Sequence, residues 1–406
     1  MFPSALREIK IAVMVRRAYL ACTITLFCVS ACAETPPSDD PADYDIDTSI
    51  DYTIKVDPPS WIIPSDSLPP QIQAMASNNN VDLEYFEDRL FVAWRSAPTH
   101  FAGEDTKMYI MSSDDEGKNW DFEHEIALGT DAREPRLLNY NGELQFLFFE
   151  AGKVAIEFRP KKVWRCFRNG QGDWTELQTM TEEPEIPWDM KVRNGIAYMT
   201  SYAGGHYIAD ETIKVFFKQS ENGKDWETVG GYPFVYEGGV SEVAFEFDED
   251  GNLWAITRNE DGDESGFGSH LCFAPAEDLG RWQCPEMSSP ERYDSPEMFR
   301  HGKDIYIVAR RDVGGDFGDG DLYQYSSRPK TTALYQVNRD TKQVVHLFDL
   351  PGAGDNAFPA VRRAGPHTFT LVNYTSPLDD PNISWIEGQL SERGTQIYLT
   401  RVQFIP

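Results

Sequence analysis

Short stretches in which hydrophobic and polar residues alternate, the two-residue period of β-strands, recur through most of this 406-residue chain. Six segments, each about 50 residues long, open with such a stretch, turn at Gly or Asp, and continue with a second stretch. They start at Val81, Glu134, Trp188, Ser241, Ser295 and Phe358. Each opening is typical of a β-hairpin, and helical spacing is nearly absent after the N-terminal region. The repeat predicts an all-β fold, a six-bladed β-propeller over residues 48–406.

The two ends of the repeat region are expected to pair. The last segment lacks a fourth strand, because residues 397–402 are expected to be its third strand and the chain then ends. Another alternating stretch, residues 52–56, precedes the first segment. We expect this N-terminal strand to supply the missing outer strand and close the ring, since that pairing leaves no long strand edge open.

One turn carries a recognisable motif. Residues 113–120, Ser-Asp-Asp-Glu-Gly-Lys-Asn-Trp, fit the pattern S-x-D-x-G-x-x-W, and weaker copies occur at 219–226, 168–174 and 279–282. In this Asp-box the Asp holds backbone amides of a tight turn, the Gly takes the left-handed conformation and the Trp packs between sheets. Together with the repeat, the motif makes the sequence resemble the sialidase (neuraminidase) family of six-bladed propellers with Asp-box (BNR) repeats.

Charged and aromatic residues fall at equivalent points of the repeats. In a four-stranded blade, the start of the innermost strand and the end of the second strand meet on one face, around the central channel. The first position reads Asp82, Glu134, Asp189, Glu242, Ser295 or Glu297, and Phe358, and the second reads Arg95, Glu150, Tyr202, Arg258, Arg310 and Tyr374. Carboxylates and Arg side chains crowded in a partly desolvated funnel shift one another's pKa values, as a catalytic or anion-binding site requires.

The resemblance to sialidases implies roles for four of these residues. Sialidases grip the substrate carboxylate with three Arg side chains and use a Tyr nucleophile that a Glu activates. Glu242 and Arg258 are similar to a Glu and an Arg on the first two strands of one blade, and Arg310 resembles a further Arg. Tyr374, within residues 373–376, resembles the nucleophile, and Glu242 would take its proton. Three Arg side chains can hold a carboxylate even on an acidic protein.

Two positions of the family have no single match. Its first Arg sits in a Phe/Tyr-Arg-Ile-Pro motif, for which Arg133 in Arg133-Glu134-Pro135 is the closest candidate and Arg95 a competitor. For its acid/base Asp the candidates are Asp131, Asp189 and Asp105. The resemblance implies an exo-glycosidase that cleaves a terminal, sialic-acid-like anionic sugar, with Glu134, Tyr202 and His100 as further candidates for substrate binding.

Two other functions stay open at this point. Invertase-like furanosidases place an Asp, an Arg-Asp-Pro and a Glu along a five-bladed propeller, and Asp82, Glu134 and Glu242 imitate that series. A surface lipoprotein that binds sugar without cleaving it would use the same ring of Trp, Tyr and Arg, with His100 lining the funnel. The charged positions alone therefore do not choose between an enzyme and a carbohydrate-binding protein.

The N-terminus differs from everything that follows. A basic start leads into the apolar run 18–31, which is too short to span a bilayer and is typical of a signal peptide over residues 1–31. Residues 29–32, Val-Ser-Ala-Cys, resemble the bacterial lipoprotein box, which implies a lipid on Cys32. Residues 32–47, rich in Pro, Ser and Asp, would form a flexible tether. We expect a protein exported and lipid-anchored in the bacterial cell envelope, or periplasmic or secreted if it is cleaved without lipid.

The balance of acidic and basic residues limits the classes of partner that the protein is expected to bind. The chain carries 66 acidic against 37 basic residues, a formal net charge of -29. Such a field repels nucleic acids and anionic membrane surfaces, so the lipid anchor would be the only membrane contact. We expect a monomer that binds a glycan or small carbohydrate and needs no cofactor. The acidic loops 259–264 and 312–321 fit no calcium-loop spacing, so no metal site is predicted.

Two cysteines are placed to form a disulfide. Cys272 and Cys284 lie symmetrically about the turn 275–280, so paired strands would bring them together in an oxidising compartment. Cys166 has no evident partner and is expected to be a buried thiol.

Overall fold

Each predicted repeat forms one antiparallel sheet of the protein, whose computed structural model describes residues 38–155, 158–208, 211–315 and 322–406. The six sheets, in chain order, are β3 (Ser77–Phe86), β4 (Arg89–Ala97), β5 (Lys107–Ser113) and β6 (Asp121–Ile126); β7 (Asp131–Tyr140), β8 (Glu143–Gly152), β9 (Val163–Arg168) and β10 (Gln178–Thr181); β11 (Ile186–Arg193), β12 (Ile196–Gly204), β13 (Ile213–Ser220), β14 (Glu227–Thr228) and β15 (Tyr236–Gly238); β16 (Val240–Phe247), β17 (Leu253–Asn259) and β18 (Leu271–Ala274); β19 (Asp294–His301), β20 (Asp304–Asp312), β21 (Lys330–Asn338) and β22 (Gln343–Leu350); and β23 (Ala360–Gly365), β24 (Thr368–Thr375) and β25 (Gln396–Ile405) with β1 (Thr53–Val56) and β2 (Ser60–Ile63).

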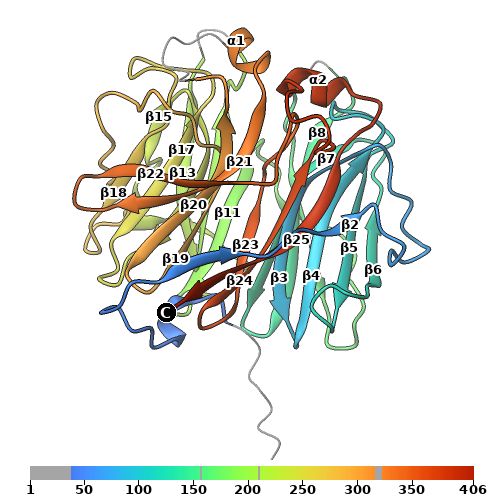
Figure 1. Ribbon diagram of the computed structural model, residues 1–406, viewed down its shortest axis with the longest axis horizontal. Coiled ribbons are helices and arrows are strands. Elements are labelled where there is room, and N and C mark those ends of the chain that lie inside the picture. The colour runs from blue at the N-terminus through green and yellow to red at the C-terminus, as the bar shows by residue number, and fades with distance from the viewer. Residues whose placement is uncertain (1–37, 156–157, 209–210, 316–321) are drawn as a thin grey trace, which may run out of the picture. The chain divides into compact units, whose positions relative to one another are not determined.

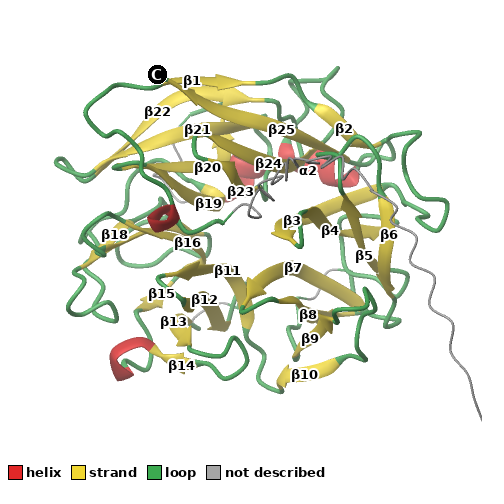
Figure 2. Cartoon of the chain, turned by 90° about the horizontal axis from the view of Figure 1, so that it is seen from below, coloured by secondary structure: helices red, strands yellow, loops and turns green. Residues whose placement is uncertain are grey.

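The sheets are blades arranged around a central channel. Their innermost strands, β3, β7, β11, β16, β19 and β23, contact one another in this order, and β23 contacts β3 again (Figure 2). The predicted six-bladed β-propeller is thereby confirmed. Blades three and six consequently lie on opposite sides of the channel.

The N-terminal strand closes the ring as predicted. β1 pairs antiparallel with β25, from Thr53 opposite Ile405 to Val56 opposite Val402, and β2 adds Ser60 opposite Leu399 (Figure 2). The last blade therefore takes its outer strands from the beginning of the chain, and its hydrogen bonds join the two ends of the propeller.

The hydrophobic core lies between neighbouring blades. One cluster joins blades one and two through Phe91, Met108, Phe146 and Phe148, and comparable clusters join blades two and three, four and five, and five and six. Such clusters form because each blade buries both faces of its alternating strands against the next sheet. The channel is left to the side chains of the innermost strands, which include most of the charged residues considered below.

Turns and loops add few other elements. The turn after β5 is held by Ser113 Oγ, which accepts a hydrogen bond from Gly117 N at 2.8 Å, and by Asp115, which accepts from Asn119 N at 2.8 Å. Gly117 has a φ of 87°, which favours glycine. Cys272 and Cys284 form a disulfide beside β18, and Cys166 is a buried free thiol.

Four short helices complete the described chain: η1 (Pro41–Asp43), η2 (Val229–Gly231), α1 (Leu322–Ser326) and α2 (Trp385–Leu390). Within the described ranges, none of them has the length and apolar character needed to traverse a bilayer. The expected signal peptide and the lipid attachment at Cys32 lie outside the described residues, while the expected tether enters them at Ser38.

Candidate active site

A pocket of about 640 Å³ occupies the end of the channel where the innermost strands begin. Side chains from all six blades line it, together with residues of α1 and α2, which lie at the top of Figure 1. The polar and aromatic lining includes Asn80, His100, Arg133, Glu134, Tyr202, His206, Glu242, Arg258, Glu260, Ser295, Arg310, Tyr374, Trp385 and Gln389. Ring closure therefore gathers residues from distant parts of the sequence at one place.

Irregularities at the start of the innermost strands decide which residues face this pocket. The pairing register shifts between Asn79 and Val81 in β3, and corresponding shifts occur in β7, β11, β16 and β19. Asn80, Glu134 and Ser295 take left-handed φ values of 49°, 54° and 50° at these points. A bulge re-aims one side chain and displaces its neighbours, so the residues two positions further along do not reach the pocket.

Two carboxylates predicted to line the site are consequently elsewhere, which corrects the sequence analysis. Asp82 is buried and accepts a hydrogen bond from Leu137 N at 2.6 Å, and Asn80 lines the pocket in its blade. Asp189 is also buried and pairs with Lys191 at 2.7 Å. Neither lines the pocket, so neither serves there as nucleophile or acid/base.

Of the two candidates for the first Arg of the family, Arg133, the closer match, lines the pocket and Arg95 does not. Arg95 is fully buried outside the pocket, with its Nε 2.8 Å from Asp131 Oδ1. The other oxygen of Asp131 binds Arg133 Nε at 2.5 Å, and Arg133 Nη2 donates to the carbonyl of His100 at 2.8 Å. Asp131 is therefore a buried counter-ion between two guanidinium groups, which orients Arg133 toward the pocket, and is unsuited to proton transfer with a substrate.

Arg258 lies in the pocket wall with its η nitrogens engaged by carboxylates. Nη1 contacts Glu242 and Nη2 contacts Glu260, both at 2.5 Å. The carboxylate of Asp294 lies 3.5 Å from Nε. The pairing of Glu242 with Arg258 predicted from sequence is thus present, and it holds the guanidinium in place.

Arg310 differs because it lacks a close carboxylate. Its Nε donates to the carbonyl of Asn356 at 2.8 Å and its Nη2 to Ser295 Oγ at 3.3 Å, while Asp294 lies 3.8 Å away. Nη1 has no hydrogen-bond partner among the described residues, although the side chain is only 3% exposed. The guanidinium also lies 4.9 Å from the ring centroid of Trp385. A buried donor of this kind favours a ligand that brings an acceptor.

Tyr374 hydrogen-bonds to Asp355 rather than to Glu242. Its hydroxyl donates to Asp355 Oδ1 at 3.1 Å, and the second oxygen of Asp355 lies 2.7 Å from His100 Nδ1. Glu242 is instead engaged by Arg258 and by the backbone N–H of Ser295. The pairing of Tyr374 with Glu242 that the sialidase resemblance implied is therefore absent, and Asp355, which the sequence analysis missed, takes that position.

The surroundings tune the protonation of this group. Burial and the neighbouring Asp355 carboxylate raise the pKa of Tyr374 well above its ordinary value. Burial lowers the pKa of His100 despite the attraction of Asp355. Burial raises the pKa of Asp355, but His100 and Arg310 outweigh it and hold that pKa below its ordinary value. Asp355 is therefore an ionised acceptor at neutral pH, placed between the phenol of Tyr374 and the imidazole of His100.

Glu134 is a pocket carboxyl whose pKa lies close to neutral pH. Burial, opposed by Arg136 and assisted by Glu242, raises its pKa to about 7, and its Oε2 accepts a hydrogen bond from Asn80 at 2.9 Å. A carboxyl that is partly protonated at neutral pH can donate a proton to a leaving group. Sequence reasoning placed Glu134 at the site as a substrate-binding residue, but its environment also suits proton transfer.

His206 and Glu260 complete one wall. Burial lowers the pKa of His206, but its contacts with Asp261 at 3.0 Å and Glu260 at 3.4 Å raise it to about 9, so this imidazole is cationic at pH 7. The sequence analysis named neither as a site residue: Glu260 lies in the acidic loop 259–264 after β17, and His206 lies in the loop after β12. Across the described ranges, no group of three or more His, Cys, Asp or Glu side chains is arranged to hold a metal ion.

No protein-family model and no curated protein matches this chain. Solved structures share its fold at low identity. A protein of unknown function from Dyadobacter fermentans matches with a TM-score of 0.60 and 12% identity, over 86% of this chain and 99% of its own. The phage phi92 endosialidase matches with a TM-score of 0.56 and 9% identity, over 88% and 70%. The Trypanosoma rangeli sialidase in complex with sialic acid gives 0.54 and 10%, over 80% and 54%, so the chain spans about half the length of that sialidase. The chain is a six-bladed β-propeller with sialidases among its structural neighbours.

Proposed function

We propose that the protein is a sialidase-like exo-glycosidase that cleaves a terminal, carboxylate-bearing sugar from glycans outside the cytoplasm. The observation that carries the proposal is the convergence of Arg133, Arg258 and Arg310, from three different blades, on the pocket that contains Tyr374. Export and a lipid anchor at Cys32 belong to the proposal and rest on the N-terminal sequence alone.

The arginines supply the recognition. On a chain with a formal net charge of -29, an anionic sugar must be held by local cations, and guanidinium groups match a carboxylate with planar, paired donors. Arg310 offers a buried nitrogen without an acceptor, and Arg133 reaches the pocket with Nε and Nη2 engaged. A substrate carboxylate between these two groups would replace the missing acceptor of Arg310.

Tyr374 and Glu134 supply the chemistry. The phenol oxygen of Tyr374 attacks the anomeric carbon while its proton passes to Asp355, and the glycosidic C–O bond breaks as Glu134 protonates the leaving oxygen. Water then attacks the same carbon and Glu134 takes its proton, while the bond to Tyr374 breaks and the phenolate regains its proton from Asp355. The neutral phenol suits an anomeric centre that carries a carboxylate, because an anionic nucleophile would be repelled.

Binding without cleavage is the second candidate, and one observation favours it. Burial raises the pKa of Tyr374 well above its ordinary value, which makes the phenol hard to ionise. A pocket of arginines and aromatic rings would still bind an anionic sugar. The furanosidase alternative is weakened because Asp82, its proposed first carboxylate, is buried outside the pocket of a propeller with six blades.

The test is a panel of fluorogenic sialosides, uronides and furanosides. We expect cleavage of a carboxylated glycoside by the wild type and a loss of roughly a thousandfold in kcat/KM for Tyr374→Phe, because a nucleophile is removed. Tyr323→Phe is the matched control, since Tyr323 is 82% exposed and lies outside the pocket lining.

Calorimetric titration with the same sugars separates the two candidates. Binding that Arg310→Met weakens at least about a hundredfold, without turnover, would identify a carbohydrate-binding protein. Turnover that is insensitive to Tyr374→Phe would contradict the mechanism. Failure of every carboxylated sugar to bind would contradict both candidates.

A further inference from the structure

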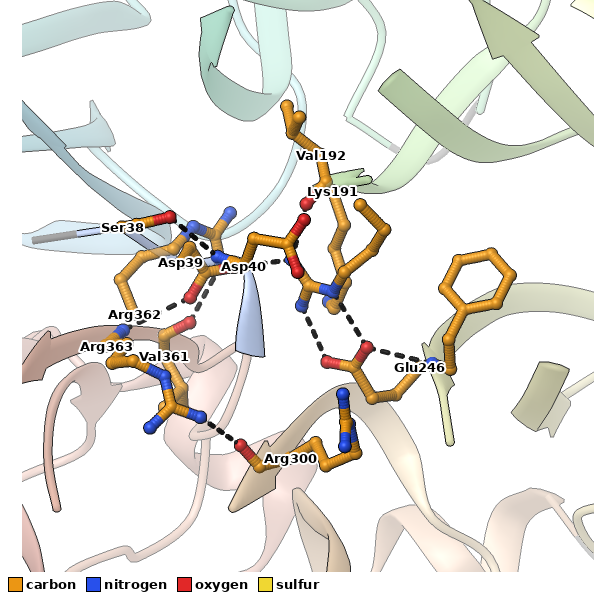
Figure 3. Close-up of polar contacts among 12 residues, drawn as sticks. Ser38, Asp39, Asp40, Lys191, Val192, Glu246, Arg300, Val361, Arg362 and Arg363 are labelled. Carbon is orange, nitrogen blue, oxygen red and sulfur yellow. Dashed lines mark hydrogen bonds and ion pairs between the residues drawn. The ribbon is translucent and has the colours of Figure 1, made fainter. Parts of the chain in front are cut away.

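The channel end opposite the pocket is closed by the chain's own residues 38–44. The innermost strands start at the pocket and terminate at this opposite end of the channel. The segment crosses below them at the bottom of Figure 1. Asp39 Oδ2 lies 3.2 Å from Arg193 Nη1 of β11, and its Oδ1 accepts a hydrogen bond from Arg363 N of β23 at 3.1 Å (Figure 3). Because β11 and β23 belong to opposite blades, one carboxylate bridges the two sides of the channel.

Arg363 is a buried cation at this end of the channel, and a negative charge near it is favourable. The residue is 1% exposed, and its guanidinium donates to the carbonyl of Pro366 at 2.9 Å and to the carbonyl of Arg300 (Figure 3). Among the described residues, no carboxylate lies within ion-pair distance of it, and Nε has no hydrogen-bond partner. A buried cation without a nearby negative charge is strongly unfavourable. The Asp39 carboxylate, which accepts a hydrogen bond from the backbone N–H of Arg363, has the largest Coulombic effect on the pKa of this guanidinium and partly offsets the lowering by burial.

The docked segment fits the site through several contacts. Burial raises the pKa of Asp39, but Arg193, Arg362 and Lys191 outweigh it and keep the carboxyl ionised. The ring of Tyr44 lies 4.8 Å from the Arg363 guanidinium. The hydroxyl of Tyr44 also accepts a hydrogen bond from Ser38 N at 3.0 Å, which folds the segment back on itself.

Asp40 fixes the segment to the rim. Its Oδ2 accepts a hydrogen bond from Asn194 N at 2.5 Å, while its Oδ1 caps η1 by accepting from Ala42 N at 3.0 Å. A cavity of about 510 Å³ adjoins the contact and is lined by the segment together with Lys191 and Arg362. Small anions in solution therefore have access to this end of the channel.

We propose that this end of the channel is a second anion site, specific for a carboxylate, and that Asp39 is its ligand supplied by the same chain. The segment Ser38–Tyr44 is then a latch that joins blades three and six across the channel, in addition to the strand pairing that closes the ring. The proposal does not depend on the function of the pocket. It requires that a free carboxylate replace Asp39 once that side chain is removed.

The test is chemical rescue in the full chain. Asp39→Ala should lower the melting temperature by about 5 °C, because Arg363 loses its counter-charge. Acetate at about 0.1 M should restore at least half of that loss, because it occupies the emptied site by mass action. Asp39→Asn, which keeps the shape but not the charge, should also melt lower and should respond less to acetate, because its amide still fills the site.

Two control solutes and two control proteins decide the outcome. Sodium chloride and acetamide, at the same ionic strength and concentration, should not restore stability. Wild type and Asp47→Ala should melt alike and ignore acetate, because Asp47 is exposed and its carboxylate contacts Ser49 alone. The proposal is overturned if Asp39→Ala melts like wild type, or if acetate stabilises all four proteins equally. Should Asp39→Ala fail to fold, Asp39→Asn carries the same comparison.

Discussion

The two ends of the central channel are built from the same six strands, and each combines closely paired charges with one arginine that lacks a close carboxylate. At the closed end, Lys191 lies 2.7 Å from Asp189 and Arg193 lies 2.6 Å from Glu246, while the docked segment brings Asp39 to act on the pKa of Arg363. At the pocket end, Arg258 is paired with Glu242 and Glu260, but Arg310 has its nearest carboxylate at 3.8 Å and keeps one buried nitrogen without a partner among the described residues. Closely paired buried charges stabilise a structure, whereas an unsatisfied buried donor favours a ligand.

The backbone also differs between the two ends. At the pocket end, register shifts and the left-handed residues Asn80, Glu134 and Ser295 lie inside the innermost strands. At the closed end, left-handed residues such as Asn141 and Asn194 lie in the turns between strands, and one register shift occurs in β23 between Arg363 and Gly365. Left-handed residues therefore change the direction of pocket side chains at one end and form hairpin turns at the other.

The largest effect is expected from a substitution at the closed end of the channel. Lys191→Met should lower the free energy of unfolding by about 3–5 kcal/mol, because it leaves the buried carboxylate of Asp189 without its cation and removes one of the two cations beside Glu297. Urea denaturation measures the change. Lys214→Met is the matched control: its Nζ lies 3.7 Å from Glu237 in a half-exposed pair, so the expected loss is below about 1 kcal/mol. Equal losses in the two variants would mean that the buried pairs do not stabilise the channel.

A smaller effect is expected at the pocket end, where stability should depend on pH through Glu134. The pKa of Glu134 is about 7 in the folded protein against an ordinary value of 4.5, so the folded state holds a proton that the unfolded state has released. The resulting stability is fully present below pH 4.5 and is lost as the pH rises through 7. Relative to Glu134→Gln, which cannot titrate, the wild type should lose roughly 3 kcal/mol between pH 4.5 and 8.

Comparing the two proteins at each pH cancels the titration of other buried groups, such as Glu84 and Glu297, whose pKa values are also raised by burial to about 7. Thermal or urea unfolding at pH 5, 6, 7 and 8 provides the measurement. A difference between wild type and Glu134→Gln that stays constant over this range would show that Glu134 is ionised throughout, and the proposed proton donor would be lost with it.

The fold could be predicted because its signals are local. Each hairpin combines alternating residues with a nearby turn, and the pairing of residues 53–56 with β25 follows from one missing strand. The presence of Arg258, Arg310 and Tyr374 in one pocket also followed, because equivalent positions of repeated blades meet around an axis.

The site was predicted less well because bulges change the register. Asp82 and Asp189 were assigned to the pocket by counting from regular strands, and one irregular residue in each strand places them elsewhere. A signal was available for Asp189, because Pro187 lies at the register shift of its strand, whereas β3, which contains Asp82, has no proline. Proline within a predicted strand indicates an edge or a bulge, since it cannot donate to the ladder.

Contacts between distant loops had no local signal at all. Asp355 reaches Tyr374 and His100 from the loop before β23, and α2 brings Trp385 beside Arg310 from the loop after β24. The segment that contains Asp39 was expected to be flexible because its composition is polar. Its position depends on the guanidinium of Arg193 and on the backbone N–H of Arg363, which is separated from Asp39 by 324 positions in sequence.

The smallest expected effect concerns the turns between outer strands. They lie on the same side of the molecule as the closed end but away from the channel, so losing a contact there should disturb neither end of the channel. Ser113→Ala should lower the free energy of unfolding by about 1 kcal/mol, because Ser113 Oγ accepts from Gly117 N at 2.8 Å and donates to Asp115 at 2.8 Å. Ser220 holds the equivalent place in blade three, but its hydroxyl accepts from Asn222 N at 3.4 Å and donates to Asn222 Oδ1 at 3.1 Å, both longer than these two contacts of Ser113, so Ser220→Ala should cost less. Urea denaturation of both variants, with sugar binding measured alongside, checks the order. Because the turns lie at the far ends of outer strands, neither change should alter affinity at the pocket, and a loss of binding in Ser113→Ala would mean that the blades transmit strain along their length.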